Sequence, residues 1–400
     1  MQHIENNEVT GSALEFHRKF VAWTPPLVLG IVNGRGTHSI RLFQPWRCSG
    51  LGLVPSPGFF CRSVAPVIHF AIGYNELMLR AVQKQARVCA VAAQVIRNTR
   101  LCDEHLEIEL VYLGFPNSEP GQFLELHCAE VMPESARVVA WPGEGRLQLS
   151  GLCFPRREAF LNRPFSIADH WMDADGVPHF TVISRTIGPG TAFLERLRPG
   201  DTLSVTGPLG VGFQIPRHDV PLLLVGGGVG IPPLLYLARR LHERKHRGVS
   251  MGFGVRKREY FPLRLIAEPD RGGSARICCE LPGGADYPSA VATDDGSLGV
   301  HGLVTTIVER WAEQYAAKLS EAQVLACGPQ RMLQALAAQT RRLGVGAQLC
   351  IERNMGCGLG TCLSCVVRVR EPTAQQGWRW ALSCSEGPVF DRDRLIDYNS

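Results

Sequence analysis

The sequence contains none of the features expected of a membrane-spanning or nucleic-acid-binding protein. No run approaches the roughly 18 uninterrupted apolar residues of a spanning helix, and the net charge of +5 is spread along the chain rather than gathered in blocks. Internal repeats, low-complexity tracts and a secretory signal are also lacking. With 45% hydrophobic and 20% charged residues over 400 positions, the composition predicts a cytoplasmic globular protein of two or three domains, with no membrane or nucleic-acid partner.

Cysteine, in contrast, is abundant, with 14 residues in the chain. Four of them form a C-x4-C-x2-C-x18-C run near the C-terminus, made of Cys357, Cys362, Cys365 and Cys384. The first two intervals are those of plant-type [2Fe–2S] proteins, in which four thiolates hold the cluster. Gly358 and Gly360 allow the backbone to turn tightly around an inorganic core. The run therefore predicts a one-electron centre.

Other interpretations of the cysteines remain open. Structural zinc also uses four cysteines, but usually as two C-x2-C pairs, and only Cys362 and Cys365 form such a pair here. Unliganded thiols are a further alternative, whereas disulfide frameworks suit short secreted chains. Cys350, seven residues before the run, is an additional candidate ligand, although its spacing fits no common pattern.

The chain divides into four parts by its composition and its pattern of apolar residues. Residues 1–84 have scattered prolines and no sustained period, so we expect a disordered N-terminal extension, or one that is not translated because the chain starts at Met78. Short strands in region 85–216 predict an antiparallel β-barrel, and strands alternating with helices in region 217–346 predict a doubly wound parallel sheet. A small cluster domain, 347–400, follows. Expected strands are 88–96, 105–112, 121–127, 136–141, 180–184, 202–205, 221–225, 249–255, 290–293 and 323–326, and expected helices are 232–246, 304–319 and 330–343.

A glycine-rich string follows the strand at 221–225 and opens a helix. It reads VGGGVGIPP and contains Gly226, Gly227, Gly228 and Gly230. A strand that runs through a glycine turn into a helix presents backbone N–H groups and a positive helix end to a pyrophosphate. The string is not a strict G-x-G-x-x-G, and a tight turn without a ligand would look the same.

A second string, RPFSI, lies in the barrel region and consists of Arg163, Pro164, Phe165, Ser166 and Ile167. An arginine offers a planar fork for a phosphate, and a serine three residues further on can reach a flavin ring atom. On the pattern alone, the string could equally be a strand with a surface arginine.

Together these motifs resemble the ferredoxin–NADP reductase superfamily and, within it, the electron-transfer subunit of NAD-dependent, heteromeric dihydroorotate dehydrogenases. The resemblance covers about residues 87–390. It is also carried by GDTLSVTGPLGVGF at 200–213, ATDDGS at 292–297, ACGP at 326–329, Glu352, Met355 and CSEGPVF at 384–390. The chain departs from the family pattern at three places. The interval between Cys365 and Cys384 is long, residues 269–288 look like a glycine-rich insertion, and the first 84 residues have no counterpart in the family.

The resemblance implies three cofactor sites. RPFSI would bind FAD, whose pyrophosphate would meet Gly190 and Thr191 at a helix start. NAD would meet the glycine turn together with Asp294, Cys327 and Gly328, and the four cysteines would hold a [2Fe–2S] cluster. A carboxylate such as Asp294 near the ribose would favour NAD over NADP, although an exposed turn aspartate is an equally good explanation.

The implied function is electron transfer between NAD and the FMN-containing catalytic subunit of dihydroorotate dehydrogenase, in a heterotetramer that serves pyrimidine biosynthesis. No catalytic acid, base or nucleophile is required of this chain. Two alternatives remain. The same architecture could serve another partner, such as a hydrogenase, a sulfide or sulfite redox subunit or a ferredoxin transhydrogenase, or the chain could be a zinc-stapled binding module without redox activity.

Overall fold

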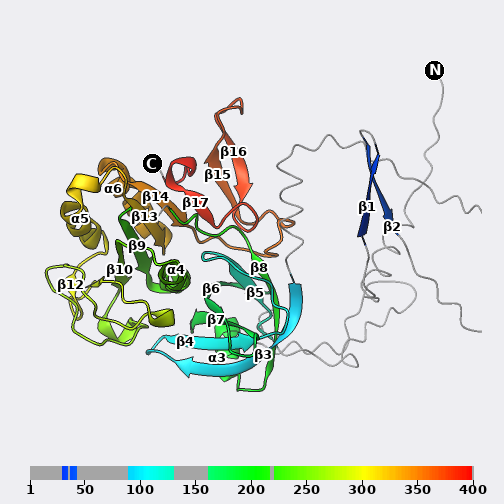
Figure 1. Ribbon diagram of the computed structural model, residues 1–400, viewed down its shortest axis with the longest axis horizontal. Coiled ribbons are helices and arrows are strands. Elements are labelled where there is room, and N and C mark those ends of the chain that lie inside the picture. The colour runs from blue at the N-terminus through cyan, green and yellow to red at the C-terminus, as the bar shows by residue number, and fades with distance from the viewer. Residues whose placement is uncertain (1–28, 35–36, 43–88, 130–160, 217–219, 399–400) are drawn as a thin grey trace, which may run out of the picture. The chain divides into compact units, whose positions relative to one another are not determined.

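The computed structural model describes residues 29–34, 37–42, 89–129, 161–216 and 220–398. The chain divides into two units, Met1–Glu76 and Leu77–Ser400. In the first unit, β1 (Leu29–Gly34) and β2 (Thr37–Leu42) form an antiparallel hairpin that the sequence did not predict. The rest of the expected N-terminal extension lies outside the described residues. The second unit contains a barrel and a parallel sheet (Figure 1).

Six antiparallel strands close into the predicted barrel, in the order β3-β4-β7-β6-β5-β8. Side chains alternate along these strands, so that Leu203 and Val205 of β8 are buried in the core while Thr202 and Ser204 are exposed. The strand expected at 136–141 lies outside the described residues. The elements are β3 (Cys89–Arg100), β4 (His105–Val111), β5 (Phe123–Leu126), β6 (Arg163–Met172), β7 (Pro178–Arg185), α3 (Pro189–Arg196) and β8 (Thr202–Leu209).

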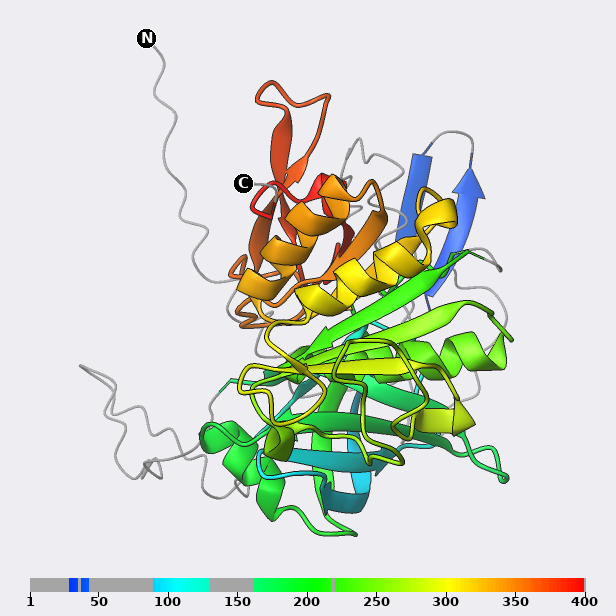
Figure 2. The ribbon, with the colours of Figure 1, turned by 90° about the vertical axis from the view of Figure 1, so that its left-hand side faces the viewer.

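The second layer is a seven-stranded sheet in the order β12-β11-β10-β9-β13-β14-β17, parallel except for the last strand. Helix α4 packs on one face, while α5 and α6 cover the other (Figure 2). The predicted doubly wound sheet is therefore confirmed. The elements are β9 (Leu222–Gly227), α4 (Ile231–Glu243), β10 (Val249–Val255), β11 (Ser289–Thr293), β12 (Val300–His301), α5 (Thr305–Gln314), β13 (Gln323–Cys327), α6 (Gln330–Arg342), β14 (Gly346–Cys350) and β17 (Val389–Asp391).

The helix expected at 304–319 is shorter than predicted. Helix α5 ends at Gln314 and is followed by a 3₁₀ turn, Ala316–Lys318. Tyr315 and Leu319 both pack against the sheet core. The two residues flank the 3₁₀ turn, so the turn keeps this segment against the sheet after the α-helix has ended.

Barrel and sheet are joined by a buried polar contact. Tyr236 of α4 is fully buried in the barrel core, and its hydroxyl donates to the Ser118 carbonyl over 2.7 Å. The Ser118 hydroxyl in turn lies 2.8 Å from Nδ1 of His170 on β6. An ion pair of 2.6 Å joins Arg239 of α4 to Asp169. These contacts hold the two layers in one orientation.

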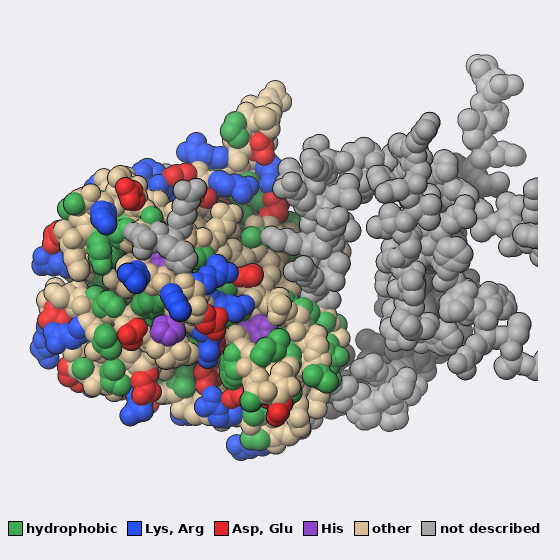
Figure 3. All heavy atoms as spheres, in the orientation of Figure 1, with side chains coloured by type: hydrophobic (Ala, Val, Ile, Leu, Met, Phe, Trp, Pro, Cys, Tyr) green, Lys and Arg blue, Asp and Glu red, His purple; other side chains and the backbone are tan. Residues whose placement is uncertain are grey.

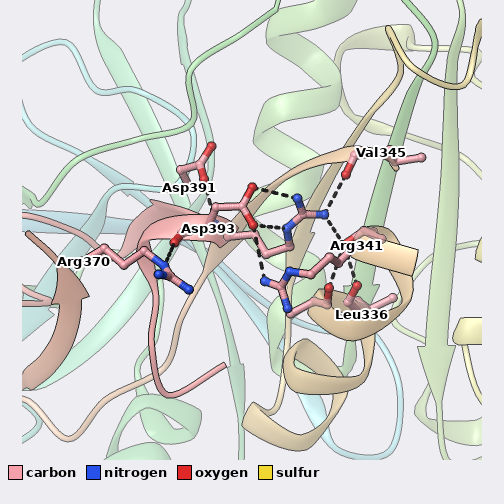
Figure 4. Close-up of polar contacts among 9 residues, drawn as sticks. Leu336, Arg341, Val345, Arg370, Asp391 and Asp393 are labelled. Carbon is pink, nitrogen blue, oxygen red and sulfur yellow. Dashed lines mark hydrogen bonds and ion pairs between the residues drawn. The ribbon is translucent and has the colours of Figure 1, made fainter. Parts of the chain in front are cut away.

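The C-terminal part forms a hairpin and then returns to the sheet. Strands β15 (Val366–Arg370) and β16 (Trp378–Leu382) are antiparallel, and β17 pairs with the edge strand β14. The buried Arg392 guanidinium donates to the Val345 carbonyl at 2.7 Å and to Asp393 at 2.8 Å (Figure 4). The small domain is thereby fixed to the sheet.

Charges of both signs are interspersed over the face of the molecule in Figure 3, in agreement with the spread charge of the sequence. Within the described part of the chain, no helix is long and apolar enough to cross a membrane.

Candidate functional site

The RPFSI string begins β6, next to β5 in the barrel. Arg163 pairs with Leu126, Pro164 with Glu125, and Ser166 with Phe123. Ile167 is buried in the barrel core, whereas the four residues before it are only half-buried. The string is therefore partly accessible from Arg163 to Ser166 and is anchored in the barrel core by Ile167.

The Arg163 guanidinium is available for an anion. It donates only to the carbonyl groups of Leu161 (2.9 Å) and Asn162 (3.3 Å). Among the described residues, no carboxylate lies within ion-pair distance of it. A guanidinium with no bound carboxylate can take a phosphate oxygen pair without losing an internal ion pair.

Gly190 and Thr191 lie in the first turn of α3, as the resemblance implies. Gly190 is buried, and the Thr191 hydroxyl accepts the N–H groups of Ile187 (2.9 Å) and Gly188 (3.0 Å). The side chain of Thr191 thus shapes the turn. A ligand at this helix start would meet backbone N–H groups rather than the hydroxyl.

The glycine turn between β9 and α4 lies against the end of β13. A Cβ at Gly230 would stand 2.2 Å from the Cys327 carbonyl oxygen, and one at Gly227 would stand 2.3 Å from the sulfur of Met332. Gly228 has φ +51°, a conformation that favours glycine. The structure therefore brings the predicted glycines together with Cys327 and Gly328 at the carboxyl edge of the sheet, where nucleotides bind in such folds.

Cys327 lies beside Cys350, its register partner on β14. The neighbouring Cys350 thiol, followed by burial, raises the pKa of Cys327 well above its ordinary value. Cys327 is therefore a neutral thiol. Cys350 is buried in the sheet and belongs to this pair, which disfavours it as a cluster ligand.

Asp294 and Asp295 follow β11 at the same edge of the sheet. The Asp295 carboxylate accepts from the Ser297 hydroxyl (2.6 Å) and N–H (3.0 Å), and these bonds lower its pKa. Asp294 is exposed, and no side-chain hydrogen bond engages it within the described segments. Of the two, Asp294 is free to meet a ribose.

The four predicted cluster cysteines lie together in two pairs. The N–H of Cys362 donates to Cys357 Sγ at 3.4 Å, and the N–H of Cys384 donates to Cys365 Sγ at 3.4 Å. Ser364 and then Cys357 lower the pKa of the Cys362 thiol to about 6, whereas burial and Cys365 raise the pKa of Cys384 to about 12.

This paired arrangement fits a binuclear cluster. A [2Fe–2S] core spreads four thiolates, two on each iron, around two metal ions and two sulfides. A single tetrahedral zinc would instead need all four sulfurs about 2.3 Å from one point.

Strand β5 connects the RPFSI strand with the cysteines. Phe123 of β5 and Leu209 of β8 form one apolar cluster with Cys365 and Cys384. The Val211 N–H also donates to the Gly387 carbonyl, over 2.5 Å. The two predicted redox sites are thus neighbours within one packed unit.

Sequence reasoning missed Glu125, which lies at this junction. All four residues of β5 are buried, and Glu125 is only 1% exposed. The one available signal was a carboxylate within the apolar string Phe123-Leu124-Glu125-Leu126.

Comparison with known proteins agrees with this arrangement. The model of the iron–sulfur cluster binding domain of dihydroorotate dehydrogenase B matches residues 352–396. A solved NADH-dependent reduced ferredoxin-NADP oxidoreductase has a TM-score of 0.53 and 21% identity, and the match covers 76% of this chain and 90% of that one. At this identity the likeness establishes the fold alone.

Sequence relatives are closer. The electron transfer subunit of dihydroorotate dehydrogenase B (NAD(+)) from Caldanaerobacter subterraneus is 32% identical over 305 residues, covering 76% of this chain and 97% of that protein. The subunit of the same name from Geobacillus kaustophilus is 38% identical over 243 residues, covering 60% of this chain and 81% of that protein. With the barrel, the sheet and the cysteine pairs in place, the chain belongs to the family of dihydroorotate dehydrogenase B electron transfer subunits.

Proposed function

We propose that this chain transfers electrons between NAD and a dihydroorotate dehydrogenase catalytic subunit, through FAD and a [2Fe–2S] cluster, in pyrimidine biosynthesis. The observation that carries the proposal is the position of β5. It pairs with the RPFSI strand on one side and packs against Cys365 and Cys384 through Phe123 on the other. One strand thereby separates the expected flavin site from the expected cluster site.

The flavin site would be formed by the barrel. Arg163 would bind the pyrophosphate, supported by the first-turn N–H groups of α3 at Gly190 and Thr191, and Ser166 would face the ring. A bound flavin exchanges two electrons with a nicotinamide and single electrons with an iron–sulfur centre. The chain's own contribution is to orient the cofactors, since the proposed steps need no side-chain acid or base.

The nicotinamide nucleotide would lie at the carboxyl edge of the parallel sheet. The glycine turn permits a close approach of the pyrophosphate through Gly226, Gly227, Gly228 and Gly230. The neutral Cys327 thiol and Gly328 would line the same site at the end of β13. Asp294 would accept from the ribose hydroxyls and repel a 2′-phosphate. These positions support NAD as the nucleotide.

The cluster loop offers an apolar face to the catalytic subunit. Leu359 is 45% exposed and Leu363 is 60% exposed, on either side of the exposed Cys362. Leu363 also has φ +59°, a strained conformation for leucine. A one-electron centre must approach its acceptor closely, so we place the partner here, in a heterotetramer with two copies of each subunit.

The test is to produce the chain together with the catalytic subunit of its own organism and to measure dihydroorotate-dependent NAD reduction. We expect a yellow-brown complex with FAD, iron and acid-labile sulfide, and activity that requires both chains. Zinc without acid-labile sulfide would overturn the electron-transfer proposal. A complete set of cofactors without orotate formation would overturn the choice of partner alone.

A further inference from the structure

Glu125 is a carboxylic side chain buried between the barrel and the cluster loop. Leu124 and Leu126, its neighbours on β5, belong to the barrel core, so Glu125 and Phe123 point to the opposite face of the strand. On that face Phe123 packs against Cys365 and Cys384. Glu125 therefore faces the cluster domain rather than the barrel interior.

Glu125 packs against the loop of the cluster domain that carries Cys357. A Cβ on Gly358 would stand 2.6 Å from Cγ and 2.8 Å from Oε1 of Glu125. Gly358 is buried and has φ +68°. In the barrel, the backbone of Glu125 pairs with Pro164 of RPFSI. The residue thus contacts the cluster loop while belonging to the strand beside the flavin motif.

Neither carboxyl oxygen of Glu125 has a hydrogen-bond partner among the described residues. The carboxyl group lies in the buried contact with Gly358, so the neutral acid is the form that avoids an unpaired buried charge there. A buried polar group without a partner costs folding free energy that an apolar side chain of similar size would not cost. A bound group on the cluster side would supply the missing partner.

We propose that Glu125 is a positioning residue that donates a hydrogen bond from its carboxyl O–H toward the sulfur atoms held by the Cys357–Cys362 loop and so raises the reduction potential of the cluster. The inference rests on the proposed [2Fe–2S] cluster. Hydrogen bonds to cluster sulfurs are one of the means by which a protein sets the potential, because a donor stabilises the additional electron.

The test is an EPR-monitored redox titration of the complete complex at one fixed pH, with the variants Glu125→Gln and Glu125→Leu. Glutamine keeps a donor in nearly the same volume, so its potential stays near that of the wild type. Leucine removes the donor, so the ratio of reduced to oxidised cluster at a given potential falls by roughly threefold to tenfold, where tenfold corresponds to about 59 mV. The leucine variant also melts at a higher temperature.

Glu109 provides a matched control, because it is a buried carboxylate engaged by His179 at 2.7 Å and by Arg97 at 3.0 Å, and its strand β4 is separated from β5 by β7 and β6. Glu109→Gln is expected to lower the melting temperature and leave the potential unchanged. Glu125→Met serves as a second apolar variant if the leucine variant does not retain its cluster.

The outcomes separate the inference from the proposed function. A positive shift of the potential in Glu125→Gln would mean that the residue acts as a buried negative charge, and equal potentials in all variants would mean that it does not act on the cluster; either result overturns the inference. Wild-type complex without acid-labile sulfide would instead overturn the proposed cluster, whatever the variants do.

Discussion

The Cα of Gly230 lies against the Cys327 carbonyl, so that a Cβ on residue 230 would stand 2.2 Å from that oxygen. Gly230→Ala must therefore push α4 away from the end of β13. We expect a loss of about 1–3 kcal/mol in the free energy of unfolding and a raised KM for NADH, measured by chemical denaturation and steady-state kinetics. Gly228→Ala, which meets no atom within 4 Å but has φ +51°, should have the smaller effect. Equal losses of stability in the two variants would contradict the close contact between residue 230 and the Cys327 carbonyl.

Cys362 and Cys350 are expected to respond differently to substitution. Cys362→Ala should remove the cluster while the chain retains FAD and reduces a dye with NADH, since the barrel and the sheet are complete without that thiol. Cys350→Ala should retain the cluster, because Cys350 pairs with Cys327 in the sheet. Iron and acid-labile sulfide analysis checks both variants. Cluster loss in Cys350→Ala, or full electron transfer to the partner in Cys362→Ala, would count against the assignment.

Asp294 is expected to select the nucleotide. Asp294→Asn removes the charge that repels a 2′-phosphate, so the ratio of kcat/KM for NADH to that for NADPH should fall about tenfold, equivalent to about 1.4 kcal/mol. Asp295→Asn is the control, since that carboxylate is held by Ser297. An effect confined to Asp295 would reverse the roles of the two residues.

Leu363 is expected to matter for association rather than for the fold. Glycine relieves the strain of φ +59° and removes the exposed apolar side chain. Leu363→Gly should leave the melting temperature of the isolated chain unchanged or higher and weaken partner binding by about 1 kcal/mol, roughly fivefold in Kd. Calorimetric titration with the catalytic subunit measures this. Leu113→Gly, also exposed but on the barrel, should not weaken binding.

His170 makes stability depend on pH. Burial lowers its pKa to about 4, below the ordinary value of about 6.5. Between these values the unfolded chain binds more protons than the folded one, so the free energy of unfolding is highest above about pH 6.5 and falls as the pH drops toward 4, by at most about 3 kcal/mol. Denaturation curves of His170→Gln should show a weaker pH dependence in this window. An unchanged dependence would argue against His170 as its source.

The strand order of the barrel could not be predicted from the sequence, and its strand β6 was not among the expected strands. The other barrel strands and the alternation of strands and helices in the sheet domain were predicted. Strands such as 105–112 and 249–255 have clear apolar patterns, and both were confirmed as β4 and β10. Strand β14 (Gly346–Cys350) and β17 (Val389–Asp391) were not predicted, because they are short and depend on pairing with each other and with β13. Local pattern carries no information on such long-range pairing.

The candidate site shows the same division. The cysteine run and RPFSI were visible as motifs because their chemistry needs neighbouring residues. The position of Glu125 at the candidate site could not be predicted, because it depends on a contact with Gly358, more than two hundred positions away in the chain. The Cys327–Cys350 pair likewise exists only through the register of β13 and β14. Contacts between distant segments are the part of a site that motif reading leaves out.

The antiparallel strand β17 has a consequence for the order of assembly. It covers the edge of β14 and is made of Val389–Asp391, which is synthesised after β14 and after the four predicted cluster cysteines. Until then, β14 is an open edge that can pair with another chain. Because Cys384 lies only five residues before β17, the fourth cluster ligand and the edge cover become available together. Closing the sheet and completing the predicted cluster site therefore depend on one short segment, and a chain shortened before Cys384 would lose both its edge protection and its fourth predicted ligand.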